Sequence, residues 1–126
     1  MSRAVAKILW TKAQGGFHAA VVLANADPPI GDEAVGLHLQ QAAEKATKAL
    51  LTWKNIKYPF THDIHTLLQL LAGKDCVVPE QFWDLDTLTP FATQARYERV
   101  VPPGSLDRSA FLALVREFLA WTAGAR

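Results

Sequence analysis

The feature that most constrains this chain is a helical repeat of apolar residues that returns in almost every segment. Apolar positions recur every three or four residues, which places them on one face of an α-helix, and no segment sustains the two-residue alternation of a half-buried strand. The clearest repeat lies between about Asp32 and Asn55. Its apolar face is predicted to contain Leu39, Ala43, Ala46, Leu50 and Trp53. The sequence therefore predicts an all-α protein.

A first helix is predicted from about Arg3 to Ala26. Proline cannot continue a helix and restricts the residue before it, so Asp27-Pro28-Pro29 ends this segment. Gly15 and Gly16 in its middle each cost about 1 kcal/mol relative to alanine. The pair is expected either to let a neighbouring helix approach closely or to kink the helix. The predicted inward face contains Val5, Leu9, Ala13, Gly16, Ala20 and Leu23.

A third helix is predicted after Tyr58-Pro59, which stops the second. Thr61 is its expected N-cap, and Asp63 would then lie in the first turn, where the helix dipole favours a negative charge. Gly73 is expected to end it. The predicted buried face contains Ile64, Leu67, Leu68 and Leu71.

The remaining part of the chain predicts two more helical segments. Phe82, Leu85 and Leu88 indicate a turn or two of helix, after which Thr89-Pro90 reads as an N-cap followed by proline at the first helical position. That helix is expected to continue to about Arg99. The last helix is predicted from about Leu106 to Ala123. Its predicted inward face contains Phe111, Leu114, Phe118 and Trp121.

The connections between these segments are short, and short connections make neighbouring helices antiparallel. We therefore expect a single domain, residues 1–126, folded as an up-and-down bundle of four to five helices. Four tryptophans and six phenylalanines are more aromatic bulk than a bare monomer of this size needs, so some of that surface is expected to serve association. The expected assembly is a two-fold homodimer. The second helix and the region of Arg96 are expected near its seam.

Composition narrows the classes of function. The net charge is only +1, so any binding of phosphates must come from a local patch. A single cysteine allows no internal disulfide and fits a reducing cytosol, and no apolar run reaches the roughly 20 residues that cross a bilayer. The stretch from Phe17 to Ala24 resembles a short signal-peptide core, but His18 interrupts it. We expect a cytoplasmic protein with no membrane association.

Three motifs resemble landmarks of the HEPN family, and they occur in the family's order. They are LQQAAEKATKALL at 39–51, THDI at 61–64, and LTPFA at 88–92, which runs on to Arg96 and Tyr97. The resemblance implies a helical bundle that forms homodimers and associates with nucleotides or RNA. Many small members are encoded beside a minimal nucleotidyltransferase in a toxin–antitoxin-like pair. The resemblance therefore implies such an enzyme as a partner protein.

Some members of that family are metal-independent ribonucleases. They carry an arginine followed a few residues later by a histidine, and the two pairs converge across the dimer. Arg96 matches the arginine, but no histidine follows it in this sequence. The missing group would share proton transfer, a role worth about 10²- to 10⁴-fold in rate. The resemblance therefore favours a non-catalytic member.

The strongest candidates for ligand binding are Arg96, Tyr97 and Arg99. Two arginines three residues apart lie on the same side of a helix and could clamp phosphate oxygens, while the tyrosine could stack on a base. Arg96 and Tyr97 are also the candidates for a catalytic role. The alternative is structural: Arg96 pairs with a carboxylate at the dimer seam and Tyr97 packs.

A second candidate group lies on the polar side of the second helix. It consists of Gln41, Glu44, Lys45 and Lys48, with Lys48 four residues after Glu44 in the favourable orientation for a helical ion pair. One interpretation is a polar lining to a cleft between subunits, where a lysine meets phosphate. The other is an ordinary solvated helix face, and residue types alone favour that one.

His62 and Asp63 are secondary polar candidates. His62 and His65 are three residues apart, but further ligands are not evident and structural zinc sites want four, so capping explains this stretch better than a metal. We expect no metal and no cofactor, although a nucleotide could be a ligand. Three hypotheses remain: a non-catalytic module that partners a nucleotidyltransferase, a ribonuclease that uses Arg96 with Tyr97 or His62, and a purely structural dimerisation domain.

Overall fold

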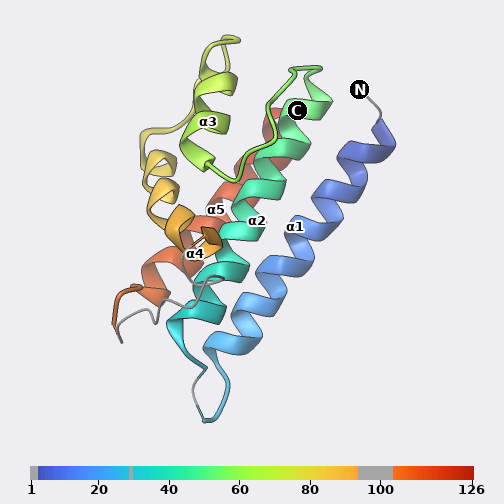
Figure 1. Ribbon diagram of the computed structural model, residues 1–126. Coiled ribbons are helices and arrows are strands. Elements are labelled where there is room, and N and C mark those ends of the chain that lie inside the picture. Colours follow the sequence, from blue (N-terminus) through green and yellow to red (C-terminus); the bar gives the residue numbers. More distant parts are fainter. Residues whose placement is uncertain (1–2, 29, 94–103) are drawn as a thin grey trace.

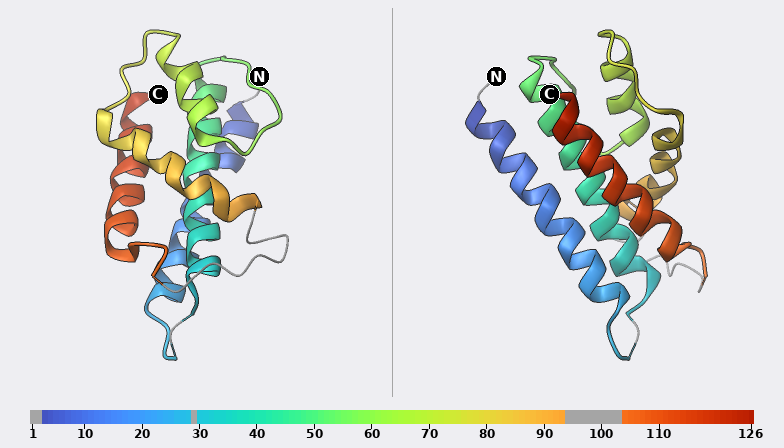
Figure 2. Two further views of the ribbon diagram at one scale, coloured as in Figure 1. Left: turned by 60° about the vertical axis from the view of Figure 1, so that its left-hand side comes forward. Right: turned by 180° about the vertical axis from the view of Figure 1, so that it is seen from behind.

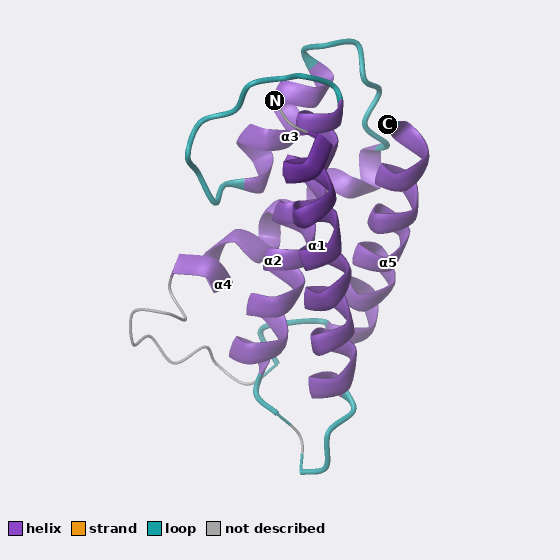
Figure 3. Cartoon of the chain, turned by 90° about the vertical axis from the view of Figure 1, so that its right-hand side faces the viewer, coloured by secondary structure: helices purple, strands orange, loops and turns teal. Residues whose placement is uncertain are grey.

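The computed structural model describes residues 3–28, 30–93 and 104–126 and is all-helical over these ranges (Figures 1 and 3). It contains three long helices, α1 (Arg3–Ala24), α2 (Asp32–Trp53) and α5 (Arg108–Ala125). The shorter elements are α3 (Ile64–Ala72), the 3₁₀ helix η1 (Glu80–Leu88) and α4 (Thr89–Thr93). The predicted all-α class is confirmed.

Helix α2 is the centre of the bundle, because it contacts every other element. Its predicted apolar face is buried, although Trp53 is only partly so, and residues on the far side are buried as well, among them Thr47 and Leu51. A helix that is buried on all sides must be covered by neighbours all round. Helix α1 packs antiparallel to it, and α5, α3 and η1 cover the rest (Figure 2).

Small residues bring α1 and α2 together. Ala6, Ala13 and Ala20 are fully buried at intervals of seven residues, and a β-carbon on Gly16 would lie 3.6 Å from that of Ala42. Of the two outcomes expected for the glycine pair, close approach is the observed one, and α1 continues through both glycines. The predicted inward face is partly wrong, because Val5 is 47% exposed and Ala6 is buried in its place.

Three helix ends are capped differently from the prediction. Helix α2 ends at Trp53 in a Schellman motif: Asn55 takes a left-handed conformation at φ 57°, and Ile56 N donates to Leu51 O over 2.8 Å. The cap of α3 is Asp63, not Thr61, because the Asp63 carboxylate accepts from the backbone N of His65. Thr89 is not an N-cap, since its backbone is helical and continues directly from η1.

The segment after α2 runs back along that helix before α3 begins, so α3 points in the same direction as α2 (Figure 1). Because the chain turns back in this way, residues 58–63 lie against the middle of α2. Its side chains meet the polar residues of α2 there. The arrangement creates the candidate site.

At the other end of the bundle, Asp32 ties the start of α2 to the start of α5. Its carboxylate accepts from Arg108 Nε over 2.7 Å and from the backbone N of Gly104 and Leu106 over 3.1 and 3.4 Å. Arg108 also donates to the Ile30 carbonyl. Burial by itself would raise the pKa of Asp32, but these hydrogen bonds and the charge of Arg108 outweigh it and lower that pKa below its usual range.

Candidate functional site

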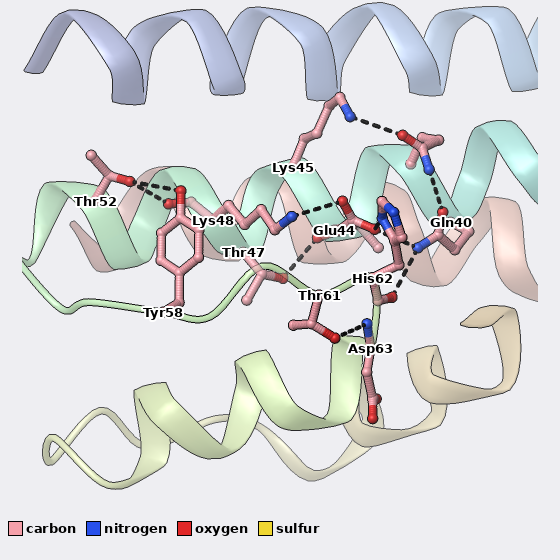
Figure 4. A network of polar contacts seen from close by, with 12 residues as sticks. Gln40, Glu44, Lys45, Thr47, Lys48, Thr52, Tyr58, Thr61, His62 and Asp63 are labelled. Atoms are coloured by element: carbon pink, nitrogen blue, oxygen red, sulfur yellow. Dashed lines mark hydrogen bonds and ion pairs between the residues drawn. The ribbon is translucent and has the colours of Figure 1, made fainter. Parts of the chain in front are cut away.

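The candidate site is a polar network centred on the carboxylate of Glu44, in the middle of α2 (Figure 4). Glu44 is 2% exposed. A buried carboxylate is tolerated only where donors surround it, since desolvation disfavours the charged form. Three donors from the same chain do so here, namely Gln40, Lys48 and His62.

Gln40 is the buried donor of the network. Its side chain is fully buried, and its Nε2 donates to Glu44 Oε1 over 2.9 Å and to the His62 carbonyl over 3.2 Å. Its Oε1 accepts from Gln41 Nε2 over 2.7 Å. The amide thus links the middle of α2 to the returning segment, and it uses both donor hydrogens to do so.

Lys48 binds the second oxygen of the Glu44 carboxylate. Its Nζ lies 3.1 Å from Glu44 Oε2, with its side chain only 12% exposed, and 5.9 Å from the centre of the Tyr58 ring. Burial alone would raise the pKa of Glu44. The hydrogen bond from Gln40 and the charge of Lys48 lead the influences that lower it, so its pKa lies below the usual value and the group is ionised at neutral pH.

His62 joins the network from the returning segment. Its Nδ1 lies 2.9 Å from Glu44 Oε1, and its side chain is 40% exposed. Because an ionised carboxylate can only accept, Nδ1 must be the protonated nitrogen in this bond. The other nitrogen, Nε2, is thereby left as the group that can accept or deliver a proton. A carboxylate that orients an imidazole in this way is an arrangement suited to acid–base chemistry.

Lys45 lies at the edge of the network, where it extends towards α1 (Figure 4). Its Nζ donates to Gln41 Oε1 over 2.8 Å. Burial of its side chain, with the positive charges of Lys48 and Lys12, lowers the pKa of Lys45 even though Glu44 opposes the change. A half-buried ammonium near two other lysines is a place where an added anion would be stabilised.

The structure brings together five of the sequence-predicted site residues: Gln41, Glu44, Lys45, Lys48 and His62. The prediction of a solvated face was wrong for Glu44 and Lys48, since both lie in the network and are largely buried. Asp63 is not part of it, because its carboxylate caps α3 and accepts from Thr66 Oγ1 over 3.1 Å. Arg96, Tyr97 and Arg99 lie outside the described residues.

Sequence reasoning missed Gln40. It lies one turn before Glu44 on the same side of α2, and this i,i+4 spacing is the signal that could have found it. A second signal is the apolar residue Leu51, which lies on the far side of α2 from the predicted stripe. Polar residues on such a helix must lie among neighbours and need partners.

Among the described residues, no group of three or more His, Cys, Asp or Glu side chains is placed to hold a metal ion. None of the helices that the structure describes is long and apolar enough to span a membrane. A family model for the HEPN domain matches residues 6–125, which is almost the whole chain. No curated protein and no solved structure matches the chain at a significant level.

Proposed function

The chain belongs to the HEPN domain family, which is often linked to RNA-related or nuclease activity, and we propose that it is a dimeric, non-catalytic module that associates with nucleotide or RNA. We further propose that its protein partner is a minimal nucleotidyltransferase in a toxin–antitoxin-like pair in the cytoplasm. The partner and the pairing rest on the family resemblance. The non-catalytic role rests on the chain itself.

The non-catalytic role is supported by one observation: the polar side chains of the α2 motif are hydrogen-bonded to one another and to His62. Both oxygens of Glu44 accept from Gln40, Lys48 and His62, and both hydrogens of the Gln40 amide are used. A network with its hydrogen bonds satisfied stabilises and orients the bundle. In addition, no histidine follows Arg96 to complete the arginine–histidine pair of the family's ribonucleases.

The test of this proposal combines binding with cleavage. Purified protein is titrated calorimetrically with ATP, UTP and a single-stranded RNA, and the same RNA is incubated with the protein in EDTA. Binding without cleavage, from a protein whose mass in light scattering is twice that of the chain, is the expected result. If none of the three ligands gives a heat of binding while the protein remains a dimer, the chain is a purely structural dimerisation domain.

The contact between Glu44 and His62 favours a second candidate, a metal-independent ribonuclease. The Nε2 of His62, whose side chain is partly exposed, would act as the acid–base group in place of the missing histidine, and Arg96 would stabilise the developing negative charge on phosphate. If RNA is cleaved in EDTA, His62→Gln and Arg96→Ala should each abolish cleavage, while His65→Gln, an exposed neighbour, should not. That outcome would replace the non-catalytic proposal.

The partner is tested through the adjacent reading frame. If that frame encodes a small nucleotidyltransferase, co-expression with a tag on this chain should yield a stoichiometric complex on size exclusion. A frame of another kind, or a nucleotidyltransferase that elutes separately, would remove the partner from the proposal. The binding experiments above stay valid in either case.

A further inference from the structure

Helices α1 and α5 lie side by side (Figure 2, right), and the described surface has a groove between them. At the end where α1 begins and α2 and α5 finish, it opens into a pocket of about 700 Å³ lined by Arg3, Lys7, Trp10, Trp53 and Arg126. A second pocket of about 350 Å³ follows between the same two helices. Trp10 also lines the first pocket, so the two pockets adjoin at this ring, and together they make up the groove.

Aromatic rings form the floor of the groove. Trp10 and Trp53 have ring centres 5.9 Å apart, and Phe17 lines the second pocket. All three rings are partly exposed and pack against the core. An anchored ring such as Trp10 can stack on a planar ligand with little further ordering cost.

Cationic side chains flank these rings. The Arg126 guanidinium carbon lies 4.5 Å from the centre of the Trp53 ring, and that of Arg116 lies 5.4 Å from the Phe17 ring. Arg3 and Lys7 add two more positive charges. No residue that lines either pocket is acidic, and α1 contains neither aspartate nor glutamate. The groove therefore has a local positive charge that the net charge of +1 conceals.

We infer that this groove binds single-stranded nucleic acid, and RNA in view of the proposed function on which this identification rests. Aromatic stacking platforms inside a positively charged groove are the combination that binds single strands without base-specific hydrogen bonds. From Arg3 to Phe17 the groove follows α1 for about 21 Å at 1.5 Å per residue, which exceeds one nucleotide and suits a strand. A second copy of the chain fits less well, because two such faces would oppose like charges.

The test uses fluorescence anisotropy with a labelled single-stranded RNA of about 12 nucleotides, within the usual site sizes for such grooves. Arg116→Glu should weaken binding and make the salt dependence shallower by about 0.7 in log–log slope, the value for one phosphate contact on a single strand. Lys74→Glu is the matched control: it makes the same charge change on an exposed residue beyond α3, outside the groove, and should bind like the unchanged protein. Equal weakening by both variants would overturn the groove.

Stacking is tested with Trp10→Ala, which should weaken binding about 5- to 150-fold. Phe17→Ala is a second aromatic variant, to be used if Trp10→Ala does not fold. Circular dichroism checks that both variants are folded. Unchanged affinity in a folded aromatic variant would refute the inference. So would loss of the dimer in Arg116→Glu, since the groove would then be a subunit interface.

The same experiment separates this inference from the proposed function. If the unchanged protein binds RNA and the groove variants bind equally well, the groove is wrong and the proposed function stands. If the unchanged protein binds neither nucleotide nor RNA, both fail. AMP as a competitor distinguishes a strand from a single nucleotide, since a strand site of this length should be displaced only weakly by AMP.

Discussion

Replacement of Gln40 by leucine tests whether the Glu44 network stabilises the fold. The substitution keeps an apolar stem of similar size but removes the donor of the 2.9 Å bond to Glu44 Oε1 and of the 3.2 Å bond to the His62 carbonyl. A hydrogen bond to a charged group contributes about 1.5–3 kcal/mol, and a partly buried carbonyl left without a donor costs at most the roughly 1–3 kcal/mol of a fully buried one. Burial of the added apolar atoms offsets part of this loss. We expect a net loss of about 2–3 kcal/mol in the free energy of unfolding.

The assay is urea unfolding at pH 7, followed by circular dichroism. With a slope of about 1–3 kcal/mol per molar urea, the midpoint should fall by about 1–2 M. Gln69→Leu, at an exposed position on α3, is the matched control and should stay within about 0.5 kcal/mol of the unchanged protein. The double variant Gln40→Leu with Glu44→Leu should lose less stability than the two single variants added together, because both changes remove the same hydrogen bond.

If Gln40→Leu is as stable as Gln69→Leu, the network does not hold the returning segment and the reasoning above is wrong. An additional signature protects against a trivial packing effect. The Gln40 bond is the foremost of the influences that lower the pKa of Glu44, so its loss should raise that pKa towards the ordinary value and reduce the amount of stability that Glu44 loses on acidification. A cavity or a clash alone would not change the pH dependence.

Three further predictions concern the pH dependence and the packing. The pKa of Glu44 is lowered in the folded state, so the contribution of Glu44 to stability is complete above the ordinary pKa of 4.5 and is lost as the pH falls through the lowered pKa. Glu44→Gln should therefore flatten this part of the curve of urea midpoint against pH. Asp32→Asn should cost about 1–3 kcal/mol in urea unfolding, whereas Asp84→Asn, on an exposed side chain of η1, should cost less than about 0.5 kcal/mol. Gly36→Ala should lower the melting temperature by several degrees, since a β-carbon at this position would lie 2.4 Å from the Phe91 ring. Gly15→Ala should raise the melting temperature, because the added methyl group meets nothing within 4 Å and alanine favours helix by about 1 kcal/mol. The packing account fails if the two glycine variants shift in the same direction.

Much of the fold could be predicted from local pattern. The 3.6-residue repeat placed the three long helices within a few residues, because one face of each must be buried whatever its neighbours are. The helix ends were less predictable. Thr61 and Asp63 both suit an N-cap, and which one caps α3 depends on where the backbone turns. Asn55 could take the left-handed position that ends α2 without a glycine or proline to announce it.

The candidate site was only partly predictable for a physical reason. Residue types identified Glu44, Lys48 and His62, but on an isolated helix a Glu–Lys pair at this spacing is solvated and weak. Its burial depends on which helices surround α2, and the contact between residues 44 and 62 depends on the path of the chain between α2 and α3.

The sequence by itself determined that this chain is helical, where its long helices lie, and which polar side chains share a face, because these properties follow from neighbours within one or two turns. Only the tertiary structure decided that α2 is buried on all sides, that His62 reaches Glu44, and that cations from α1 and α5 line one groove. Those features join residues that are far apart in sequence, and local spacing contains no information about the distance between them. Desolvation then changes their chemistry, since a carboxylate that water would surround must instead be held by donors from three positions along the chain.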